Sequence, residues 1–248
     1  MFSTTQFHLN GVKGSIDPLK LQFEGDQEPD FQSRLPEEVD VLVIGAGPAG
    51  QLLGTQLSRF PDITTRIIES KAGRLKQGNA DGLQCRTIEI FEAFGFGETV
   101  LKEAYWVNET TFWSPTEDRT GLQRSGRIRD TEADLSEMPH VILNQARLHD
   151  LWLESMKWSP TRLEPSYGRQ MTEMKIPPGQ DERVEVVVKK TDQTGRESIE
   201  RVRAKYVVGC DGARSGVRTA LGLELRGDSQ STFALFRRGS SSIANSML

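Results

Sequence analysis

A glycine-rich turn is the part of the sequence whose residue types and spacing point most directly to chemistry. It consists of Gly45, Ala46, Gly47, Pro48, Ala49 and Gly50. In a nucleotide-binding turn of this spacing, the first glycine permits a tight turn, the second lets the backbone approach a pyrophosphate, and the third permits close packing of a helix. An ordinary turn is the alternative for three glycines alone. Here an apolar run precedes the turn and leucines at near-helical spacing follow it, which predicts a dinucleotide site.

An acidic residue lies where such a site needs one. Glu69 follows Gly50 by nineteen residues and ends a second apolar run. A carboxylate there can accept hydrogen bonds from both hydroxyls of an adenosine ribose and would repel a 2′-phosphate. The sequence therefore predicts FAD or NAD rather than NADP at this turn, and the spacing does not choose between the two. A surface acid is the alternative interpretation.

Other polar residues are ambiguous when they are considered alone. Asp211, followed by Gly212, lies at the end of a predicted buried strand, where open α/β sheets bind ligands. The alternative is an aspartate that caps the next helix. Ordinary loop and helix-start positions are the simplest interpretation of Asp81, Arg86 and Gln145 when each is taken alone.

Histidines and cysteines are scarce. The chain contains His8, His140, His149, Cys85 and Cys210. None of them has the spacing of a metal site, so we expect no bound metal. Two cysteines are too few for a disulfide framework and are consistent with a reducing compartment, which predicts a cytoplasmic location.

Hydrophobic periodicity predicts the elements that must position these residues. Strand 39–44, the helix that follows the glycines and strand 64–69 form a βαβ unit, which requires a parallel sheet. Helices are further predicted over 85–94, from 144 onward and over 217–221. Strands are predicted within 107–128, over 184–190 and over 201–209, and the last two belong to a β-meander that returns to the first sheet. Gly95 and Gly97 are expected to end the helix that begins at Cys85.

The length and the net charge of the chain exclude several classes of function. The 248 residues carry a net charge of −4, which excludes the basic footprint of a nucleic-acid binder. No apolar run approaches the length of a membrane span, and no basic-then-apolar export signal begins the chain. We expect an irregular leader over 1–38, a main domain over 39–228 with an inserted segment near 105–143, and an aberrant serine-rich tail over 229–248.

Four blocks in order resemble the FAD-dependent aromatic hydroxylases, the flavoprotein monooxygenases similar to p-hydroxybenzoate hydroxylase. Within that family, the resemblance is strongest to the branch that contains phenol 2-monooxygenase and 3-hydroxybenzoate 4-monooxygenase. The blocks cover residues 39–50, 80–87, 139–147 and 206–215. The resemblance implies an α/β fold, in which a Rossmann-like FAD-binding domain with a parallel sheet and a β-meander carries part of a β-rich substrate domain. Full family members continue well beyond this length, so we expect a truncated chain of impaired activity and an incomplete sheet.

The same resemblance implies a role for each candidate residue. The turn from Gly45 to Gly50 and Glu69 would hold the ADP half of FAD. Arg86 and Gln145 would approach its pyrophosphate and ribityl region, and Asp211 with Gly212 would contact both FAD and NADPH.

The implied reaction is hydroxylation of a phenol with dioxygen through a flavin C4a-hydroperoxide, with NADPH as a transiently bound co-substrate. A phenolate is the better nucleophile, so a general base is needed in a pocket without water. Asp81 is the implied base, and His140 would orient the substrate hydroxyl. Full-length members of the family can form homodimers.

Three alternatives remain open at this point. The first is a non-catalytic FAD- or nucleotide-binding fragment, such as a pseudogene product. The second is an NAD-dependent dehydrogenase, which shares the glycine turn but leaves the blocks at 80–87 and 144–147 unexplained. The third is a non-catalytic scaffold of the GDP-dissociation-inhibitor type, which shares only the glycines.

Overall fold

The computed structural model describes residues 7–8, 11–12, 34–76, 78, 80–132, 134–179, 182–192 and 194–227. The predicted serine-rich tail lies outside these residues, and so does most of the predicted leader. Within the leader, β1 (Phe7–His8) and β2 (Gly11–Val12) pair antiparallel. In the described part of the chain, no helix is long and apolar enough to cross a membrane.

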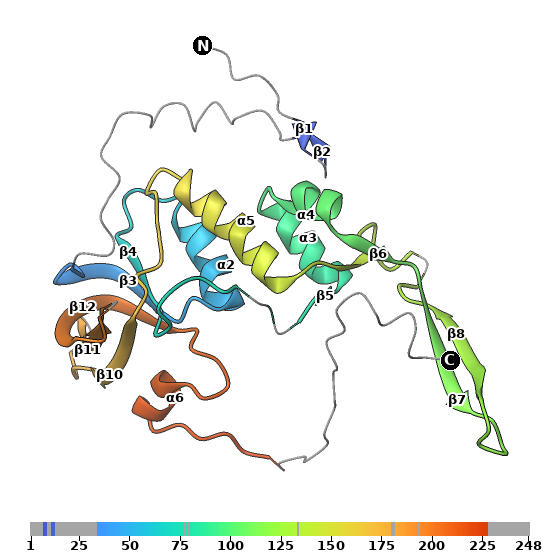
Figure 1. Cartoon of the computed structure of the whole chain (residues 1–248). Helices are drawn as coiled ribbons and strands as arrows, with labels where there is room; N and C mark the ends of the chain where they lie inside the picture. The colour runs from blue at the N-terminus through green and yellow to red at the C-terminus, as the bar shows by residue number, and fades with distance from the viewer. Residues whose placement is uncertain are drawn as a thin grey trace.

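A five-stranded mixed sheet forms the centre of the fold (Figure 1). In spatial order its strands are β10 (Arg169–Lys175), β11 (Val184–Thr191), β12 (Glu197–Gly209), β3 (Glu38–Ile44) and β4 (Thr65–Ile68). β12, β3 and β4 run parallel, whereas β10, β11 and β12 form an antiparallel meander. The predicted α/β class, with a parallel βαβ unit and a meander, is therefore confirmed. β10 was not predicted.

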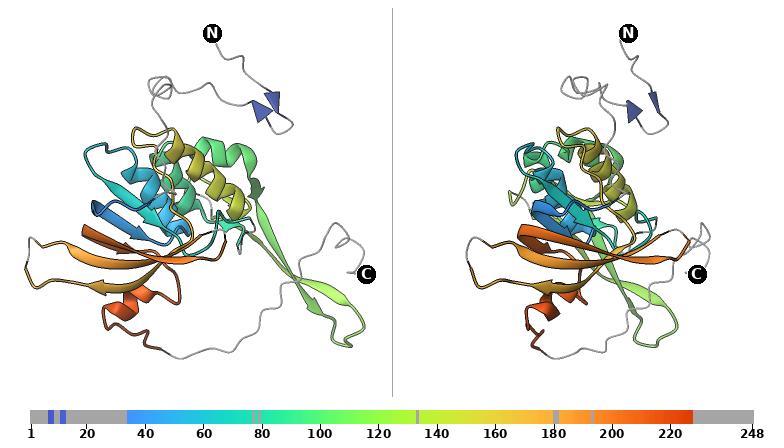
Figure 2. Two further views of the ribbon diagram at one scale, coloured as in Figure 1. Left: turned by 60° about the vertical axis from the view of Figure 1, so that its left-hand side comes forward. Right: turned by 90° about the vertical axis from the view of Figure 1, so that its left-hand side faces the viewer.

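Helices cover both faces of this sheet (Figure 2). α2 (Pro48–Leu57) and α5 (Gln145–Lys157) lie on one face, and the short α6 (Gly216–Ala220) lies on the other. Alternate residues of β3 supply both layers, since Val43 packs with Met156 of α5 and Leu42 lies in the core that contains Val217 of α6. Burial on both faces explains why β3 is a nearly continuous apolar run.

A second core lies beyond the sheet and shares α5 with it. Its other elements are α3 (Cys85–Ala93), α4 (Gly97–Glu103), β5 (Gly82–Leu83), β6 (Tyr105–Val107) and β9 (His140–Ile142). The three strands form a small sheet in the order β5, β9, β6. Phe91 of α3 meets Trp152 of α5 edge to face, with ring centroids 5.8 Å apart. α5 therefore joins the two cores.

The predicted helix boundary at Gly97 is wrong. α3 ends near Gly95, whose φ of +83° suits glycine, but Gly97 is the first residue of α4. A Cβ on Gly97 would lie 2.7 Å from the backbone nitrogen of Glu92, so glycine is needed there for close contact between two successive helices. The glycine pair marks a sharp turn between helices rather than the end of helical structure.

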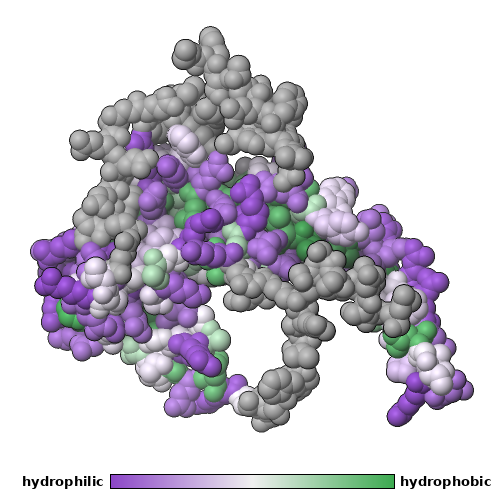
Figure 3. Space-filling view, viewed as in Figure 1, coloured by the Kyte–Doolittle hydropathy of each residue, from purple (hydrophilic) through white to green (hydrophobic). Residues whose placement is uncertain are grey.

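A long hairpin extends from the small sheet away from the body of the molecule (Figure 1). It consists of β7 (Glu109–Pro115) and β8 (Leu122–Arg129). Several of its apolar side chains are exposed, and a small apolar patch interrupts its mostly hydrophilic surface in Figure 3. They are Phe112, Trp113, Leu122 and Ile128.

Candidate cofactor site

The glycine turn joins β3 to α2 and contacts the end of β12. Gly45 has φ +103°, and a Cβ there would lie 2.4 Å from the carbonyl oxygen of Cys210. A Cβ on Gly50 would lie 1.9 Å from the carbonyl oxygen of Gly45. A Cβ on Gly47 would meet no atom closer than 3.9 Å, so the middle glycine is the least crowded of the three. The first and third glycines are needed for packing inside the fold, and the second leaves the backbone accessible to a ligand.

The N-terminus of α2 is built to accept an anion. Gly47 is its N-cap and has no side chain to cap the helix, and Pro48 occupies the first helical turn. The first N–H groups of a helix have no partner within it, and the helix dipole makes this end positive. A diphosphate placed over Gly47, Ala49 and Gly50 would satisfy both properties.

Glu69 lies beside the turn, immediately after β4. Its Oε2 accepts a hydrogen bond from the Ala46 N–H at 2.9 Å, and its Oε1 accepts one from the Lys71 N–H at 2.9 Å. The Ser70 hydroxyl also donates to Oε1 at 3.2 Å. The carboxylate is only half-buried, and its oxygens can still accept further hydrogen bonds from a ribose. The residues present thus fit the ADP half of a dinucleotide.

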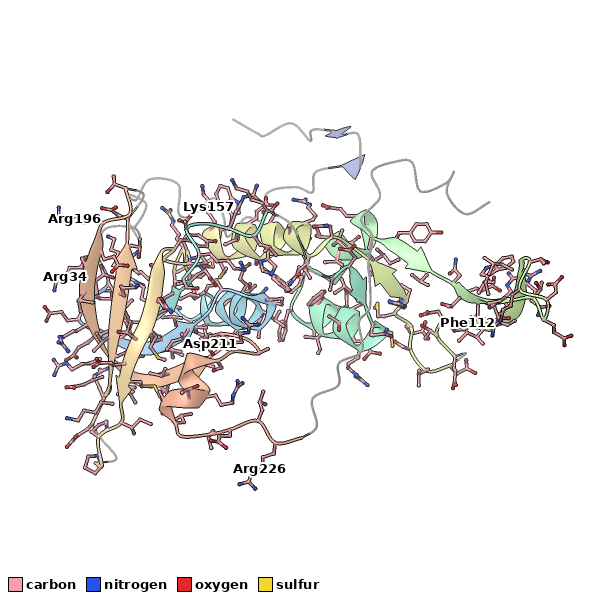
Figure 4. All side chains as sticks on the ribbon, turned by 60° about the horizontal axis from the view of Figure 1, so that its bottom comes forward. Arg34, Phe112, Lys157, Arg196, Asp211 and Arg226 are labelled. Atoms are coloured by element: carbon pink, nitrogen blue, oxygen red, sulfur yellow. The ribbon has the colours of Figure 1, made fainter. Side chains whose placement is uncertain are left out.

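Asp211 lies where β12 leaves the sheet, beside α2 in Figure 4. Its Oδ2 accepts a hydrogen bond from the Val217 N–H at 3.1 Å, as a helix-capping aspartate would, and Gly212 adopts φ +82°. Its Oδ1 is buried and has no hydrogen-bond partner among the described residues. Burial raises the pKa of Asp211, but hydrogen bonds from Ser215 and from backbone N–H groups outweigh burial and hold the pKa below its ordinary value.

Arg86 is the second residue of α3, and Gln145 is the first residue of α5. The Arg86 side chain is 81% exposed and forms an ion pair with Glu89, with Nη1 2.6 Å from Oε2. Gln145 lies against Gly78, where an added Cβ would come within 2.6 Å of the Gln145 Cβ.

Asp81 and His140 lie close together at the small sheet. The Asp81 carbonyl oxygen accepts a hydrogen bond from the Leu143 N–H at 2.8 Å, and its side chain is exposed. A Cβ on Gly82 would lie 3.2 Å from Nε2 of His140. The structure therefore brings the loop that carries Asp81 next to Nε2 of His140.

Sequence reasoning missed the partner of His140. Nδ1 of His140 lies 2.6 Å from Oδ2 of Asp130, and the two side chains are only 17% and 15% exposed. Asp130 also accepts a hydrogen bond from the Thr110 hydroxyl. No local pattern marks Asp130, because the pairing of β6 with β9 and the course of the hairpin bring it to His140.

Other groups bear on what the site can hold. Cys85 and Cys210 are free thiols. Among the described residues, no group of three or more His, Cys, Asp or Glu side chains is arranged to hold a metal ion.

A family model described as an FAD binding domain matches residues 38–238. The chain belongs to the FAD-binding domain family. 3-Hydroxybenzoate 4-monooxygenase from Comamonas testosteroni is 51% identical to this FAD-binding domain over 226 residues, which cover 90% of the chain and 35% of that protein. A phenol 2-monooxygenase from Aspergillus fumigatus is 31% identical over 196 residues, which cover 79% of the chain and 32% of that protein.

Solved structures resemble the FAD-binding domain as well. The flavin-dependent monooxygenase PieE, solved with FAD and substrate, has a TM-score of 0.65 and 26% identity over 77% of this chain and 33% of its own. p-Nitrophenol 4-monooxygenase from Pseudomonas putida has a TM-score of 0.66 over 79% of this chain and 47% of its own, and at 23% identity it supports the fold alone. The chain thus spans about a third of the length of the curated relatives that it matches.

Proposed function

We propose that this FAD-binding domain serves a flavoprotein monooxygenase that hydroxylates a phenolic substrate with dioxygen, with NADPH as reductant. The observation that carries the proposal is the position of Glu69, whose carboxylate is held against the glycine turn by a hydrogen bond from the Ala46 N–H. The identity to a 3-hydroxybenzoate 4-monooxygenase supports a phenolic substrate. A cytoplasmic location, a homodimer and the inserted segment near 105–143 stay predictions.

The cofactor side of the proposal assigns each group a contact. The N–H groups at the start of α2 would bind the pyrophosphate, and Glu69 would accept hydrogen bonds from the adenosine ribose. Arg86 and Gln145 would approach the pyrophosphate and ribityl region, and Asp211 with Gly212 would contact FAD and NADPH. When bound and reduced, FAD would supply the activation of dioxygen.

The substrate side of the proposal concerns proton transfer. Asp81 would accept the proton of the substrate hydroxyl, so the O–H bond breaks and the ring becomes a phenolate, the more nucleophilic form. Before proton transfer, His140 would orient that hydroxyl by accepting its O–H at Nε2, the nitrogen near Gly82, and the O–H would then turn to Asp81 to give up its proton. Asp130 would hold His140 as the Nδ1–H tautomer, because a carboxylate at 2.6 Å can only accept from that nitrogen.

The test is reconstitution of the 248-residue chain with FAD. We would titrate FAD by fluorescence, then follow NADPH oxidation with and without 3-hydroxybenzoate and identify the product by chromatography. FAD binding is the expected result, with substrate-dependent oxidation and a dihydroxybenzoate product at low yield, because the chain spans only about a third of the relatives it matches. An Asp81→Asn variant should bind FAD equally well and lose the product.

Two outcomes would contradict the proposal. If the chain binds NAD but no FAD, it is not a flavoprotein. If it binds FAD yet never forms product, it is a non-catalytic FAD-binding protein.

A further inference from the structure

A buried polar pair lies directly beneath the glycine turn, where α2 packs against α5. Gln51 of α2 is 1% exposed and His149 of α5 is 2% exposed. Gln51 Nε2 donates a hydrogen bond to the carbonyl oxygen of Ala46 at 3.3 Å and lies 3.2 Å from Nδ1 of His149. One side-chain amide therefore links α5 to the glycine turn.

The chemistry of the two groups fixes their hydrogens. An amide nitrogen only donates, so Nδ1 of His149 is the acceptor and the neutral imidazole carries its proton on Nε2. Both amide hydrogens of Gln51 are then used, one on Ala46 and one on His149. Without an acceptor at Nδ1, the Gln51 amide would lose the contact that holds it under the turn.

The orientation of a single peptide group depends on this link. The Ala46 carbonyl and the Gly47 N–H belong to the same planar trans peptide, so they point in opposite directions. With the carbonyl bound by Gln51 inside the fold, the Gly47 N–H is directed to the other side. Gly47 is partly exposed and uncrowded, since a Cβ there would meet no atom closer than 3.9 Å, and this is where an anion would approach the N-terminus of α2.

The pair is costly for stability, which argues for a functional role. The Gln51 Oε1, His149 Nε2 and Trp152 Nε1 atoms are buried and have no hydrogen-bond partner among the described residues. Unpartnered buried groups destabilise a fold, and places that break local packing rules tend to be functional sites. Burial also lowers the pKa of His149, which favours the neutral form that can accept at Nδ1.

We propose that His149 is a positioning residue for FAD, which acts through Gln51 to direct the Gly47 N–H toward the cofactor phosphates. This inference rests on the proposed function only in that the glycine turn binds FAD, and it does not depend on hydroxylation. The three residues on which the inference depends, Gln51, His149 and Gly47, all lie among the described residues.

The experiment compares two substitutions of the same histidine. His149→Asn keeps an acceptor oxygen near the Nδ1 position, whereas His149→Leu removes the acceptor and keeps the bulk. We expect His149→Leu and Gln51→Leu to weaken FAD binding about tenfold in a fluorescence titration. His149→Asn should remain within about threefold of the native chain. Met156→Leu is the matched control, because Met156 lies in the same helix contact and near Gly54 rather than at the turn.

A second readout needs no cofactor. The amide resonance of Gly47 in the ¹⁵N spectrum of the FAD-free chain should move in His149→Leu and stay near its native position in His149→Asn. A purely structural role would instead lower the unfolding temperature of both variants equally and would not separate them in either measurement.

The outcomes distinguish this inference from the proposed function. A native chain that binds no FAD contradicts the proposed function, and the Gly47 resonance then still tests the link. A native chain that binds FAD while His149→Leu binds equally well overturns only the role of His149. The same conclusion follows if His149→Asn is as weak as His149→Leu.

Discussion

At the scale of single residues, Glu69 is held in place by the glycine turn, and together they would form the binding site. Its two oxygens each accept a backbone N–H, so the carboxylate is oriented before any ligand arrives. A pre-oriented group loses less freedom on binding than a free side chain does. This geometry makes Glu69 the most direct residue to test.

Replacing Glu69 by Gln should weaken FAD binding about tenfold or more, because a hydrogen bond to a charged group contributes about 1.5–3 kcal/mol. An amide offers one oxygen where the carboxylate offers two, so one backbone N–H or one ribose hydroxyl loses its acceptor. A fluorescence titration measures the dissociation constant. Glu98→Gln is the control, since Glu98 pairs with Lys102 on the surface of α4, and equal affinities in the two variants would contradict the assignment.

The contact between Asp130 and His140 should fix the tautomer of the imidazole. We expect the neutral His140 ring to carry its proton on Nδ1 in the native chain and to lose that preference in Asp130→Asn. The chain has only three histidines, so long-range ¹⁵N spectra of histidine-labelled protein can be assigned with few variants. Glu132→Gln, an exposed neighbour, should leave the tautomer unchanged. An even mixture of tautomers in the native chain would contradict this prediction.

The buried His149 should also make stability depend on pH. Burial lowers its pKa below the ordinary value near 6.5, and Lys71 acts in the same direction, whereas Asp150 and Glu69 oppose the shift. The unfolded chain therefore binds the proton more readily, so the free energy of unfolding should fall as the pH drops through about 6.5. Urea unfolding at several pH values measures this fall. It should be smaller in His149→Asn, and an identical pH dependence in both proteins would contradict the prediction.

At the scale of elements, the meander is joined internally by a buried ion pair. Arg169 at the start of β10 and Glu200 of β12 lie 2.8 Å apart from Nε to Oε2, and their side chains are 0% and 7% exposed. β11 separates the two strands in the sheet, so the pair crosses the middle strand of the meander. Removing Glu200 would take away the carboxylate that faces the buried Arg169 charge and would leave weaker contacts such as the Tyr167 carbonyl oxygen, which accepts from Nη1 at 3.3 Å.

We therefore expect Glu200→Ala to lower the free energy of unfolding by about 3–5 kcal/mol. The matched control is Glu197→Ala, because Glu197 lies in the same strand and pairs with Lys189 at the surface. An exposed pair of this kind contributes about 0–1 kcal/mol. Urea unfolding followed by circular dichroism compares the two variants, and a similar small loss in both would mean that Arg169 is stabilised without Glu200.

Elements with strong local patterns were predictable from the sequence. Each of these patterns depends on residues close together in the sequence. Examples are the apolar run of β3, the glycines before α2 and the Asn144 cap of α5, whose side chain accepts from the Ala146 N–H at 2.9 Å. β10 was missed because it is largely polar and its register shifts between Met171 and Glu173, which breaks simple alternation.

The same distinction explains the candidate site. The glycine turn and Glu69 could be predicted because one βαβ unit holds both. The Asp130 contact to His140 could not, since it depends on how a hairpin and a small sheet are placed in space. The link from Gln51 to His149 was missed for the same reason, because it depends on the packing of two helices.

At the scale of the whole molecule, the hairpin exposes apolar side chains far from either core. Trp113 is 62% exposed and Leu122 is 64% exposed, and Figure 4 shows Phe112 at the end of the molecule away from Asp211. Exposed apolar patches and open strand edges favour association. We expect the 248-residue chain to associate as its concentration rises.

Light scattering after size exclusion tests this expectation. A Trp113→Thr and Leu122→Thr double variant should shift the protein toward the monomer, because threonine keeps β-propensity while it removes apolar area. Phe60→Thr, at an exposed position after α2, is the control and should not change the association. A native chain that stays monomeric over the whole concentration range would contradict the prediction.

The parallel pairing of β12 with β3 has a consequence for synthesis on the ribosome. β3 emerges early, yet its partner is the last strand of the described chain, and their register joins Glu38 to Arg203 and Ile44 to Gly209. Until β12 has left the exit tunnel, one edge of the βαβ unit remains without its native neighbour. Contacts so distant in sequence form slowly, and exposed edges attract chaperones or other nascent chains. The strand that leads into the glycine turn can therefore acquire its final neighbours only near the end of translation of the described residues.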